Sequence, residues 1–158
     1  PEAQLDRFLF KLKIDYPTIQ EEIAIVKSTT SGVPKPINPV MKQKDIIGFQ
    51  NLVLDIPVAE NVVEFAVEFV GGTRPGDERM QESVKDYIDW GAGPRASSAL
   101  ILAAKAKALL DNRTTPDISD VCSVAKLVLR HRIIRSFNAE SEGISTDQIL
   151  DLLLKKEG

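Results

Sequence analysis

The sequence contains a single cysteine, Cys122, and a single histidine, His131. One cysteine cannot form a disulfide within the chain, and one cysteine with one histidine is too few ligands for a Cys/His zinc site. No apolar run approaches the roughly 18 residues that a membrane-spanning helix needs. These absences exclude an internal disulfide, a Cys/His zinc cluster and a membrane span, and they fit a protein of the reducing cytoplasm.

Sequence motifs for catalysis are missing as well. No Gly-rich loop followed by Lys-Ser/Thr is present, so the chain has no P-loop to cradle a nucleotide. It has no nucleophile elbow and no metal-ligand spacing, and no acidic residue lies in a context that suggests a paired acid and base. Taken alone, the chain is not expected to be an enzyme or to hold a metal.

The composition is that of a soluble globular protein, with 43% hydrophobic and 27% charged residues in a length of 158. This length suffices for a real core in one ordinary domain or two small pieces. The formal charge of −3 gives no overall attraction to nucleic acid or to an anionic membrane. Because the chain begins at Pro1 without a methionine or a signal-like segment, we expect it to be a piece of a longer protein.

The first third of the chain changes its hydrophobic period several times. Residues 2–8 are expected to end a helix, and apolar side chains then alternate over 8–16, which predicts a half-buried strand. One strand cannot satisfy its own backbone, so its partners must come from elsewhere. A capping box begins a helix over 18–28, the Pro-rich segment 28–41 is a linker and the best candidate for a boundary, and a second helix spans 43–53.

The remainder of the sequence is predicted to be helical. Helices are expected over 58–70, 96–110 and 118–135, and a capping box at Ser145 begins a last helix. Residues 80–90 are compatible with a helical turn or with a short strand. The fold class is therefore mainly α, with an orphan strand before the helices.

Two charged faces have more than one interpretation. Glu60, Glu64 and Glu68 form an acidic ridge, either a solvated surface or a docking face for a partner.

The predicted 118–135 helix carries Cys122 in its apolar stripe, where a small core residue is expected. Its far end is basic, which either complements the helix dipole or contacts nucleic acid; the cations are Lys126, Arg130, His131, Arg132 and Arg135.

The most informative stretch is Gly91-Ala92-Gly93-Pro94-Arg95-Ala96, which opens an alanine-rich helix. Pro94 suits the first helical position, because its fixed φ fits a helix and its missing N–H would be unpaired there. Arg95 is the odd residue: a cation in the first turn faces the positive end of the helix dipole, unless an anion lies nearby. Arg95 is therefore either a solvated or carboxylate-paired arginine, or a contact for phosphate oxygens.

The start of the chain resembles the end of the AAA+ core in MoxR-type ATPases, which are relatives of magnesium-chelatase ATPase subunits. The resemblance lies in Pro1-Glu2-Ala3-Gln4-Leu5-Asp6-Arg7-Phe8, followed by the predicted strand and Asp-Tyr-Pro. The stretch 91–96 resembles the sensor-2 motif of that family, which usually has Ser where Gly93 stands. The similarity runs from Pro1 to about Ile134 in the family's order, and it includes 73–75 and 128–132.

The resemblance implies specific roles for two arginines. Arg7 would be an arginine finger that reaches the γ-phosphate bound to a neighbouring subunit, and Arg95, with Gly93 and Pro94 at the helix N-terminus, would contact the phosphates of ATP in its own subunit. The cofactor implied is ATP with Mg²⁺ in the full-length protein, and none is expected to be bound to this fragment.

The resemblance also implies a domain division and partners. Residues 1–57 would be the tail of the α/β core with connecting helices and the linker, and 58–158 the helical lid, with the Walker motifs lying before Pro1. The implied partners are neighbouring subunits of a homo-oligomeric ring (a hexamer by analogy) and a client protein, including a von Willebrand factor A domain protein. The parent would be a chaperone-like cytoplasmic ATPase that matures protein complexes or inserts metal cofactors, and it implies no nucleic acid and no membrane span.

Two alternatives remain beside the resemblance. A free-standing helical interaction module would leave Arg7 and Arg95 inert, and would explain the acidic ridge equally well. A helical DNA-binding domain would use the basic end of the 118–135 helix and bind duplexes with steep salt dependence. The net charge of −3 and the acidic ridge count against the second alternative.

Overall fold

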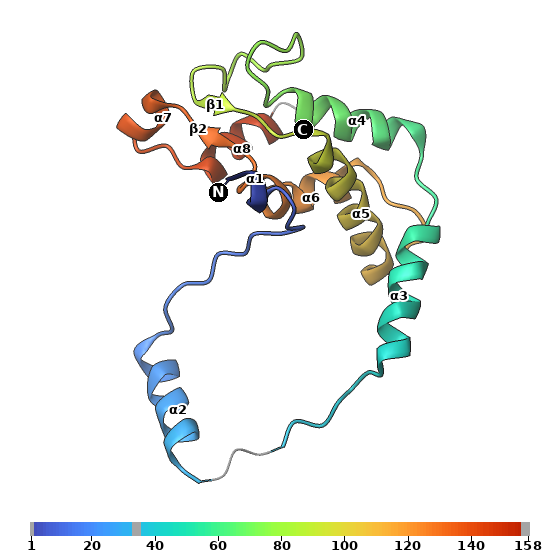
Figure 1. Ribbon diagram of the computed structural model, residues 1–158, viewed down its shortest axis with the longest axis vertical. Coiled ribbons are helices and arrows are strands. Elements are labelled where there is room, and N and C mark those ends of the chain that lie inside the picture. Colours follow the sequence, from blue (N-terminus) through green and yellow to red (C-terminus); the bar gives the residue numbers. More distant parts are fainter. Residues whose placement is uncertain (1, 33–35, 156–158) are drawn as a thin grey trace.

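The computed structural model describes residues 2–32 and 36–155 of the chain, and it is mainly helical (Figure 1). A compact helical bundle occupies the second half of the sequence, and a small antiparallel sheet lies at one side of it. The bundle is built from α4 (Glu60–Gly71), α5 (Pro94–Leu110), α6 (Ile118–Leu129), α7 (Phe137–Ser141) and α8 (Thr146–Leu154). The mainly α fold class is confirmed. No helix within the described ranges is long and apolar enough to cross a membrane.

The core of the bundle lies where α5 packs against α4 and α6, and α8 closes it from the other side of α6. Alanines on α5 let the neighbouring helices approach closely, and larger aliphatic side chains fill the rest. The largest fully buried side chains include Leu100, Leu129, Ile149, Leu150 and Leu153. Leu110, the last residue of α5, is 80% exposed because the helix ends there and the chain turns away.

The sheet resolves the ambiguity at residues 80–90. Residues 88–90 form β1 (Ile88–Trp90), which pairs antiparallel with β2 (Ile134–Arg135), with Ile88 opposite Arg135. The preceding residues form turns. The predicted helix over 118–135 is therefore wrong beyond Leu129. The local pattern favours a helix there, but β2 pairs with β1, and residues 130–132 make the contacts described below, so the helix ends earlier.

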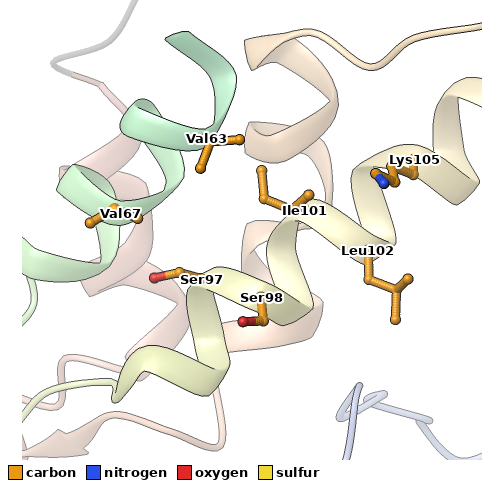
Figure 2. A pocket seen from close by; sticks show the side chains of 7 residues that line it. All are labelled: Val63, Val67, Ser97, Ser98, Ile101, Leu102 and Lys105. Carbon is orange, nitrogen blue, oxygen red and sulfur yellow. The ribbon is translucent and has the colours of Figure 1, made fainter. Parts of the chain in front are cut away.

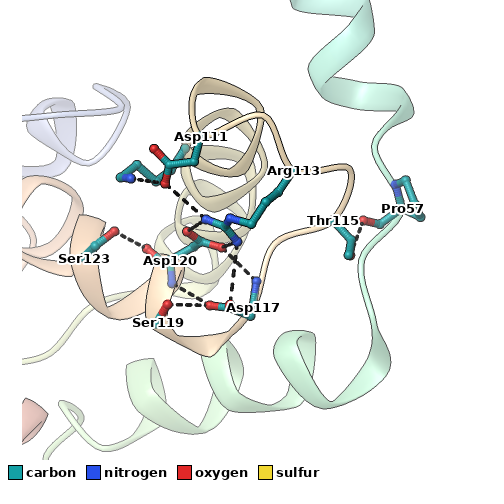
Figure 3. A network of polar contacts seen from close by, with 9 residues as sticks. Pro57, Asp111, Arg113, Thr115, Asp117, Ser119, Asp120 and Ser123 are labelled. Atoms are coloured by element: carbon teal, nitrogen blue, oxygen red, sulfur yellow. Dashed lines mark hydrogen bonds and ion pairs between the residues drawn. The ribbon is translucent and has the colours of Figure 1, made fainter.

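The turn between α5 and α6 is fixed by a charged network (Figure 3). Asp117 caps α6 by accepting from the Asp120 amide at 3.1 Å, and the Asp120 carboxylate accepts from the Asp117 amide at 2.9 Å. Arg113 donates to the buried Asp120 carboxylate, with Nη1 2.7 Å from Oδ2, and lowers the pKa of Asp120. Thr115 adds a hydrogen bond to the Pro57 carbonyl at 3.3 Å. The network sets the angle of the α5–α6 hairpin that carries the candidate site.

The first third of the chain is built differently. It contains α1 (Glu2–Leu5), α2 (Ile19–Thr30) and α3 (Gln43–Asp55), and neither α2 nor α3 buries a single residue. The capping box at Thr18 and Glu21 is confirmed. In Figure 1, α2 lies well away from the bundle, whereas α3 lies beside α5, where Lys105 Nζ donates to the Leu54 carbonyl at 3.2 Å.

The predicted strand over 8–16 is not formed. These residues are extended, but within the described chain they have no partner strand, so their alternating side chains are all exposed. Within the described residues, their one backbone–backbone hydrogen bond to the bundle runs from the Lys11 amide to the Leu127 carbonyl of α6, at 3.0 Å. The predicted linker at 28–41 is non-helical after Thr30, and its residues 33–35 lie outside the described ranges.

Candidate functional site

The glycine-framed start of α5 has the geometry that the sequence predicts. Gly93 is the N-cap in extended conformation, and Pro94 occupies the first turn of α5. A Cβ on Gly91 would lie 2.2 Å from the Thr73 carbonyl oxygen and 2.7 Å from the Arg74 Cα, whereas a Cβ on Gly93 would meet nothing within 4 Å. Gly91 is thus required by close backbone approach, and Gly93 is not.

Two residues after α4 hold this segment in place. The Thr73 hydroxyl is fully buried; it donates to the Val70 carbonyl at 2.7 Å and accepts from the Ala92 amide at 3.0 Å. Arg74 Nε donates to the Ala92 carbonyl at 2.8 Å. Both backbone polar groups of Ala92 are therefore satisfied by the 73–74 turn, which fixes the direction in which α5 begins.

Arg95 extends from the first turn of α5 with 65% of its side chain exposed. The first turn contains no acidic residue. The compensating anion comes from 89 positions earlier in the sequence: Arg95 Nη1 donates to Asp6 Oδ2 at 3.2 Å. Of the interpretations that the sequence left open, the structure shows the carboxylate-paired arginine, and the pair is open to solvent on the arginine side.

A hollow of about 430 Å³ lies beside this pair. It is lined by Asp6, Gly91, Gly93, Arg95 and Arg132, with Trp90, His131 and Ile134. The hollow joins three segments that are distant in sequence: the end of α1, the start of α5, and the turn that follows α6. Trp90, which is 69% exposed, also borders a smaller hollow on the other side of the glycines.

Arg132 is the fixed counterpart of Arg95. Its side chain is 3% exposed, and its Nε donates to Asp6 Oδ1 at 3.1 Å. Nη2 donates to the carbonyls of Asp6 and Phe8 at 2.9 and 2.8 Å, and Nη1 to those of Leu9, at 3.3 Å, and Val128. All five N–H donors of a guanidinium thus have acceptors. Arg132 clamps residues 6–9 to the end of α6.

Arg130 repeats this arrangement one step further along the extended segment. Its Nη1 donates to the Lys11 carbonyl at 3.0 Å, and its Nε donates to Asp147 Oδ1 at 3.1 Å. Lys13 Nζ reaches the same carboxylate at 2.7 Å. Burial acts to raise the pKa of Asp147, but the hydrogen bond from Lys13 and the charge of Arg130 outweigh it and lower that pKa.

His131 lies between these two arginines. Its Nε2 lies 3.0 Å from the Phe8 carbonyl oxygen. A carbonyl can only accept, so Nε2 carries the proton and donates, and Nδ1 of the neutral ring is unprotonated. Nδ1 is buried and has no hydrogen-bond partner among the described residues. Burial lowers the pKa of His131, which keeps the ring neutral at pH 7.

Arg7 lies immediately after Asp6 and is exposed. Its guanidinium has no ion pair or hydrogen bond with any residue within the described ranges. Arg95 contacts Asp6, and Arg7 is the next residue after Asp6 in the sequence. The fold therefore brings two segments that are distant in sequence together at Asp6, and of the two arginines only Arg95 borders the hollow.

Sequence reasoning missed the other charged members of this site. Asp6 was not among the predicted site residues, and the basic residues at 130–132 were assigned to a helix end or a nucleic-acid patch. Instead, Arg130, His131 and Arg132 bind backbone carbonyls of residues 6–11 and the carboxylates of Asp6 and Asp147. One signal in the sequence could have indicated a specific role for these basic residues. They lie in the 128–132 stretch that is similar to the family, and a preference of cations for helix ends does not explain that similarity.

A second hollow is of a different kind (Figure 2). This groove of about 350 Å³ runs between α4 and α5 and is lined mainly by aliphatic side chains, among them Val63, Val67 and Ile101. Lys105 is its only charged lining residue, so the groove has no pair of groups for acid–base chemistry. Across residues 2–32 and 36–155, no group of three or more His, Cys, Asp and Glu side chains lies together so as to hold a metal ion.

Comparison with known proteins places this geometry in a family. The AAA lid domain matches residues 80–153, which include the glycine motif, α5, α6 and Arg132. Chaperone MoxR1 of Mycobacterium tuberculosis is 33% identical over 98% of the chain, which covers 41% of that protein. The uncharacterized protein YeaC of Bacillus subtilis is 34% identical over 95% of the chain, which covers 44% of it.

A solved structure agrees with the sequence comparisons. The crystal structure of a putative ATPase from Cytophaga hutchinsonii superimposes on 99% of the chain with a TM-score of 0.87 and 32% identity, and the chain covers 48% of it. The chain thus spans less than half the length of each of these relatives. The sequence motifs, the lid match over 80–153 and the shared fold all agree, and together they fit part of a MoxR-type AAA+ ATPase.

Proposed function

We propose that this chain supplies two arginines to ATP hydrolysis in a MoxR-type AAA+ assembly. Arg95 contacts the phosphates of ATP bound in the same subunit, at the start of α5 formed by Gly93 and Pro94. Arg7 acts in trans as an arginine finger on the γ-phosphate of the neighbouring subunit. Each guanidinium would neutralise charge on the phosphoryl group, where such an arginine contributes orders of magnitude in rate.

One observation carries the proposal: Arg95 is an exposed cation at a helix N-terminus, beside a hollow of about 430 Å³, with one carboxylate contact within the described chain. The helix end and the guanidinium both favour an anion there. Gly93 leaves open space around the N-cap, so an oxygen-rich ligand can approach the backbone. These features fit a phosphate group in size, sign and access.

Arg7 supports the second half of the proposal by being unengaged. Its exposed guanidinium has no ion pair within the described residues, although both of its neighbours in sequence, Asp6 and Phe8, accept hydrogen bonds from Arg132. A rigid backbone with an exposed terminal cation is the form expected of a group that acts on a partner's ligand.

The Mg²⁺ that accompanies ATP would neutralise phosphate charge during transfer. The described residues offer no cluster of metal ligands, so we assign the metal's protein ligands to the Walker motifs of the nucleotide-binding core. The residues of this chain act on the phosphates alone.

The wider role follows the family. We propose a cytoplasmic ring of identical subunits, a hexamer, that couples ATP hydrolysis to chaperone-like maturation of protein complexes or insertion of metal cofactors. A von Willebrand factor A domain protein is the proposed client. The relative named Chaperone MoxR1 supports this direction.

The test uses the complete protein, with the nucleotide-binding core in place. Arg95→Ala and Arg7→Ala are each expected to reduce ATP turnover at least about a hundredfold. Mixing the two variants separates cis from trans action. An Arg7→Ala subunit keeps its own Arg95, and an adjacent Arg95→Ala subunit keeps the Arg7 that it offers in trans. An ATP site between these two subunits therefore has both arginines. In a head-to-tail ring about a quarter of interfaces would then be intact, and activity returns accordingly.

Other outcomes overturn the proposal. Unchanged turnover in both variants would favour a helical interaction module without a nucleotide function. Failure of the mixture to recover activity would contradict action in trans. The 158-residue chain alone is expected to turn over no ATP, because it lacks a P-loop.

A further inference from the structure

Asp6 joins the two arginines of the site through one carboxylate. Oδ1 accepts from Arg132 Nε at 3.1 Å, and Oδ2 accepts from Arg95 Nη1 at 3.2 Å. The Asp6 side chain is 27% exposed, so the bridge lies at the border of the hollow. A residue from the end of α1 thus connects the start of α5 with the turn after α6.

The two arginines hold this carboxylate with unequal firmness. Arg132 is 3% exposed, and its five donors are all engaged, four of them with backbone carbonyls. Arg95 is 65% exposed, and its one side-chain hydrogen bond among the described residues is with Asp6. An exposed pair of this kind is weak and readily exchanged, whereas a buried guanidinium with a full set of acceptors is not. Arg95 can therefore leave while Asp6 stays on Arg132.

We infer that Asp6 competes with nucleotide phosphate for Arg95. This inference rests on the proposed function of Arg95. Without nucleotide, the Asp6 carboxylate holds the Arg95 guanidinium; when ATP binds, phosphate oxygens replace Oδ2 as its acceptor, and Asp6 keeps its bond to Arg132. Asp6 is thus a positioning residue that acts through Arg95.

The place of Asp6 in the chain gives this exchange a consequence. Asp6 is joined by a peptide bond to Arg7, and its own carbonyl accepts from Arg132 Nη2 at 2.9 Å. Gain or loss of the Arg95 contact therefore changes how tightly Asp6, the residue before the proposed finger Arg7, is held. In this way the nucleotide bound to one subunit would affect the arginine that this subunit offers to its neighbour.

Asp6→Asn in the complete protein tests the competition. Asparagine keeps Oδ1 as an acceptor for Arg132 but removes the charge that attracts Arg95. We expect the Kd for the fluorescent analogue mant-ATP to fall about threefold to fivefold, because an exposed ion pair is the only competitor removed. Asp6→Ser, a second neutral variant with an acceptor oxygen, is expected to shift the Kd in the same direction.

A double-mutant cycle separates competition from general electrostatics. In an Arg95→Ala background, Asp6→Asn is expected to leave the Kd unchanged, because the competition no longer exists. Equal tightening in both backgrounds would show that Asp6 acts only as a nearby negative charge, and it would overturn the inference. The matched control is Asp147→Asn, which removes a carboxylate that binds an arginine and Lys13 but not Arg95; its Kd should equal that of the wild type.

The inference and the proposed function fail in different ways. If Arg95→Ala does not weaken mant-ATP binding, the phosphate role of Arg95 is wrong, and the inference falls with it. If Arg95→Ala weakens binding but neither Asp6→Asn nor Asp6→Ser tightens it, the phosphate role stands and the competition alone is wrong.

Discussion

The first third of the chain and the bundle have similar sequence patterns but opposite environments. Residues 43–55 and 118–129 both form capped amphipathic helices, yet α3 buries none of its residues and α6 buries half of its length. The apolar stripe of α2 is likewise exposed, with Ile19, Ile23 and Val26 each about half exposed or more. A pattern therefore specifies a helix and its apolar face, while burial depends on what the rest of the protein places against that face.

Besides the contact of α3 with α5, the first third of the chain meets the bundle along the segment 6–13. This segment is extended and apolar on alternate residues, and Arg130, His131 and Arg132 of the bundle bind its carbonyls. The contact is thus polar and made through the backbone, so it does not depend on which apolar side chains the segment carries. The apolar side chains of the segment remain available to pack against another surface.

The largest effect should come from matched truncations in the two regions. Leu100→Ala removes a fully buried side chain of α5 and is expected to lower the free energy of unfolding by about 3 to 4 kcal/mol. Ile23→Ala in α2, where 48% of the side chain is exposed, should cost less than about 0.5 kcal/mol. Urea unfolding of the 158-residue chain measures both. Equal losses would show that α2 is packed in solution and would remove the contrast.

The next largest effect tests the line of contact itself. Arg132→Ala leaves the carbonyls of residues 6–9 and the Asp6 carboxylate without their donor, and it should cost about 2 to 3 kcal/mol. The Lys11 amide, which bonds to Leu127, should then exchange its hydrogen faster. Arg132→Lys keeps the charge but not the planar fork and should give an intermediate loss. Unchanged exchange at Lys11 in Arg132→Ala would show that another contact joins the regions.

A smaller effect separates the two glycines of the motif. Gly91→Ala places a methyl group 2.2 Å from the Thr73 carbonyl oxygen, which is backbone and cannot swing away, so we expect a loss of about 2 kcal/mol. Gly93→Ser meets no atom within 4 Å and introduces a better N-cap, so stability should rise by a few tenths of a kcal/mol. Thermal unfolding of both variants measures the difference. Similar melting temperatures would contradict the close approach at Gly91.

The smallest effect concerns pH. Burial depresses the pKa of His131 below its ordinary 6.5, so between that value and the lower folded-state value the unfolded chain binds a proton that the folded chain does not. Stability is therefore fully present above pH 6.5 and declines as the pH falls below it. His131→Gln keeps an N–H donor for Phe8 but does not titrate, and His131 is the only histidine. The melting temperature of the variant should fall less than that of the wild type between about pH 7.5 and 5.5; parallel declines would refute the assignment.

Much of the fold follows from local patterns in the sequence. The capping boxes at Thr18 and Ser145 and the start of α5 at Pro94 are all correctly predicted, because they depend on residues within one or two turns. The strand at 8–16 was wrongly predicted for the complementary reason. Alternation shows that a segment suits a sheet, but a strand exists only where a partner strand lies beside it.

The candidate site divides in the same way. Its two proposed contacts with phosphate, Arg7 and Arg95, were found from their motifs. The contacts of Arg130, His131 and Arg132 were not, because these donors and their acceptors at 6–11 are more than 110 residues apart and no local rule connects them. The helix predicted to reach residue 135 ends at Leu129 for this reason. Long-range contacts with the first segment and with β1 outweigh the helical preference of the basic residues.

The sequence by itself predicted which segments are helical, where most of them begin, the resemblance to MoxR-type ATPases, and the two arginines in the motifs that carry this resemblance. Only the tertiary structure decided that Asp6 is the anion facing Arg95, that Gly91 rather than Gly93 is sterically required, and that the basic turn binds backbone carbonyls. The physical reason is range. Caps and periodicity act over a few residues, whereas ion pairs, close backbone approaches and carbonyl clamps depend on how distant segments meet in space.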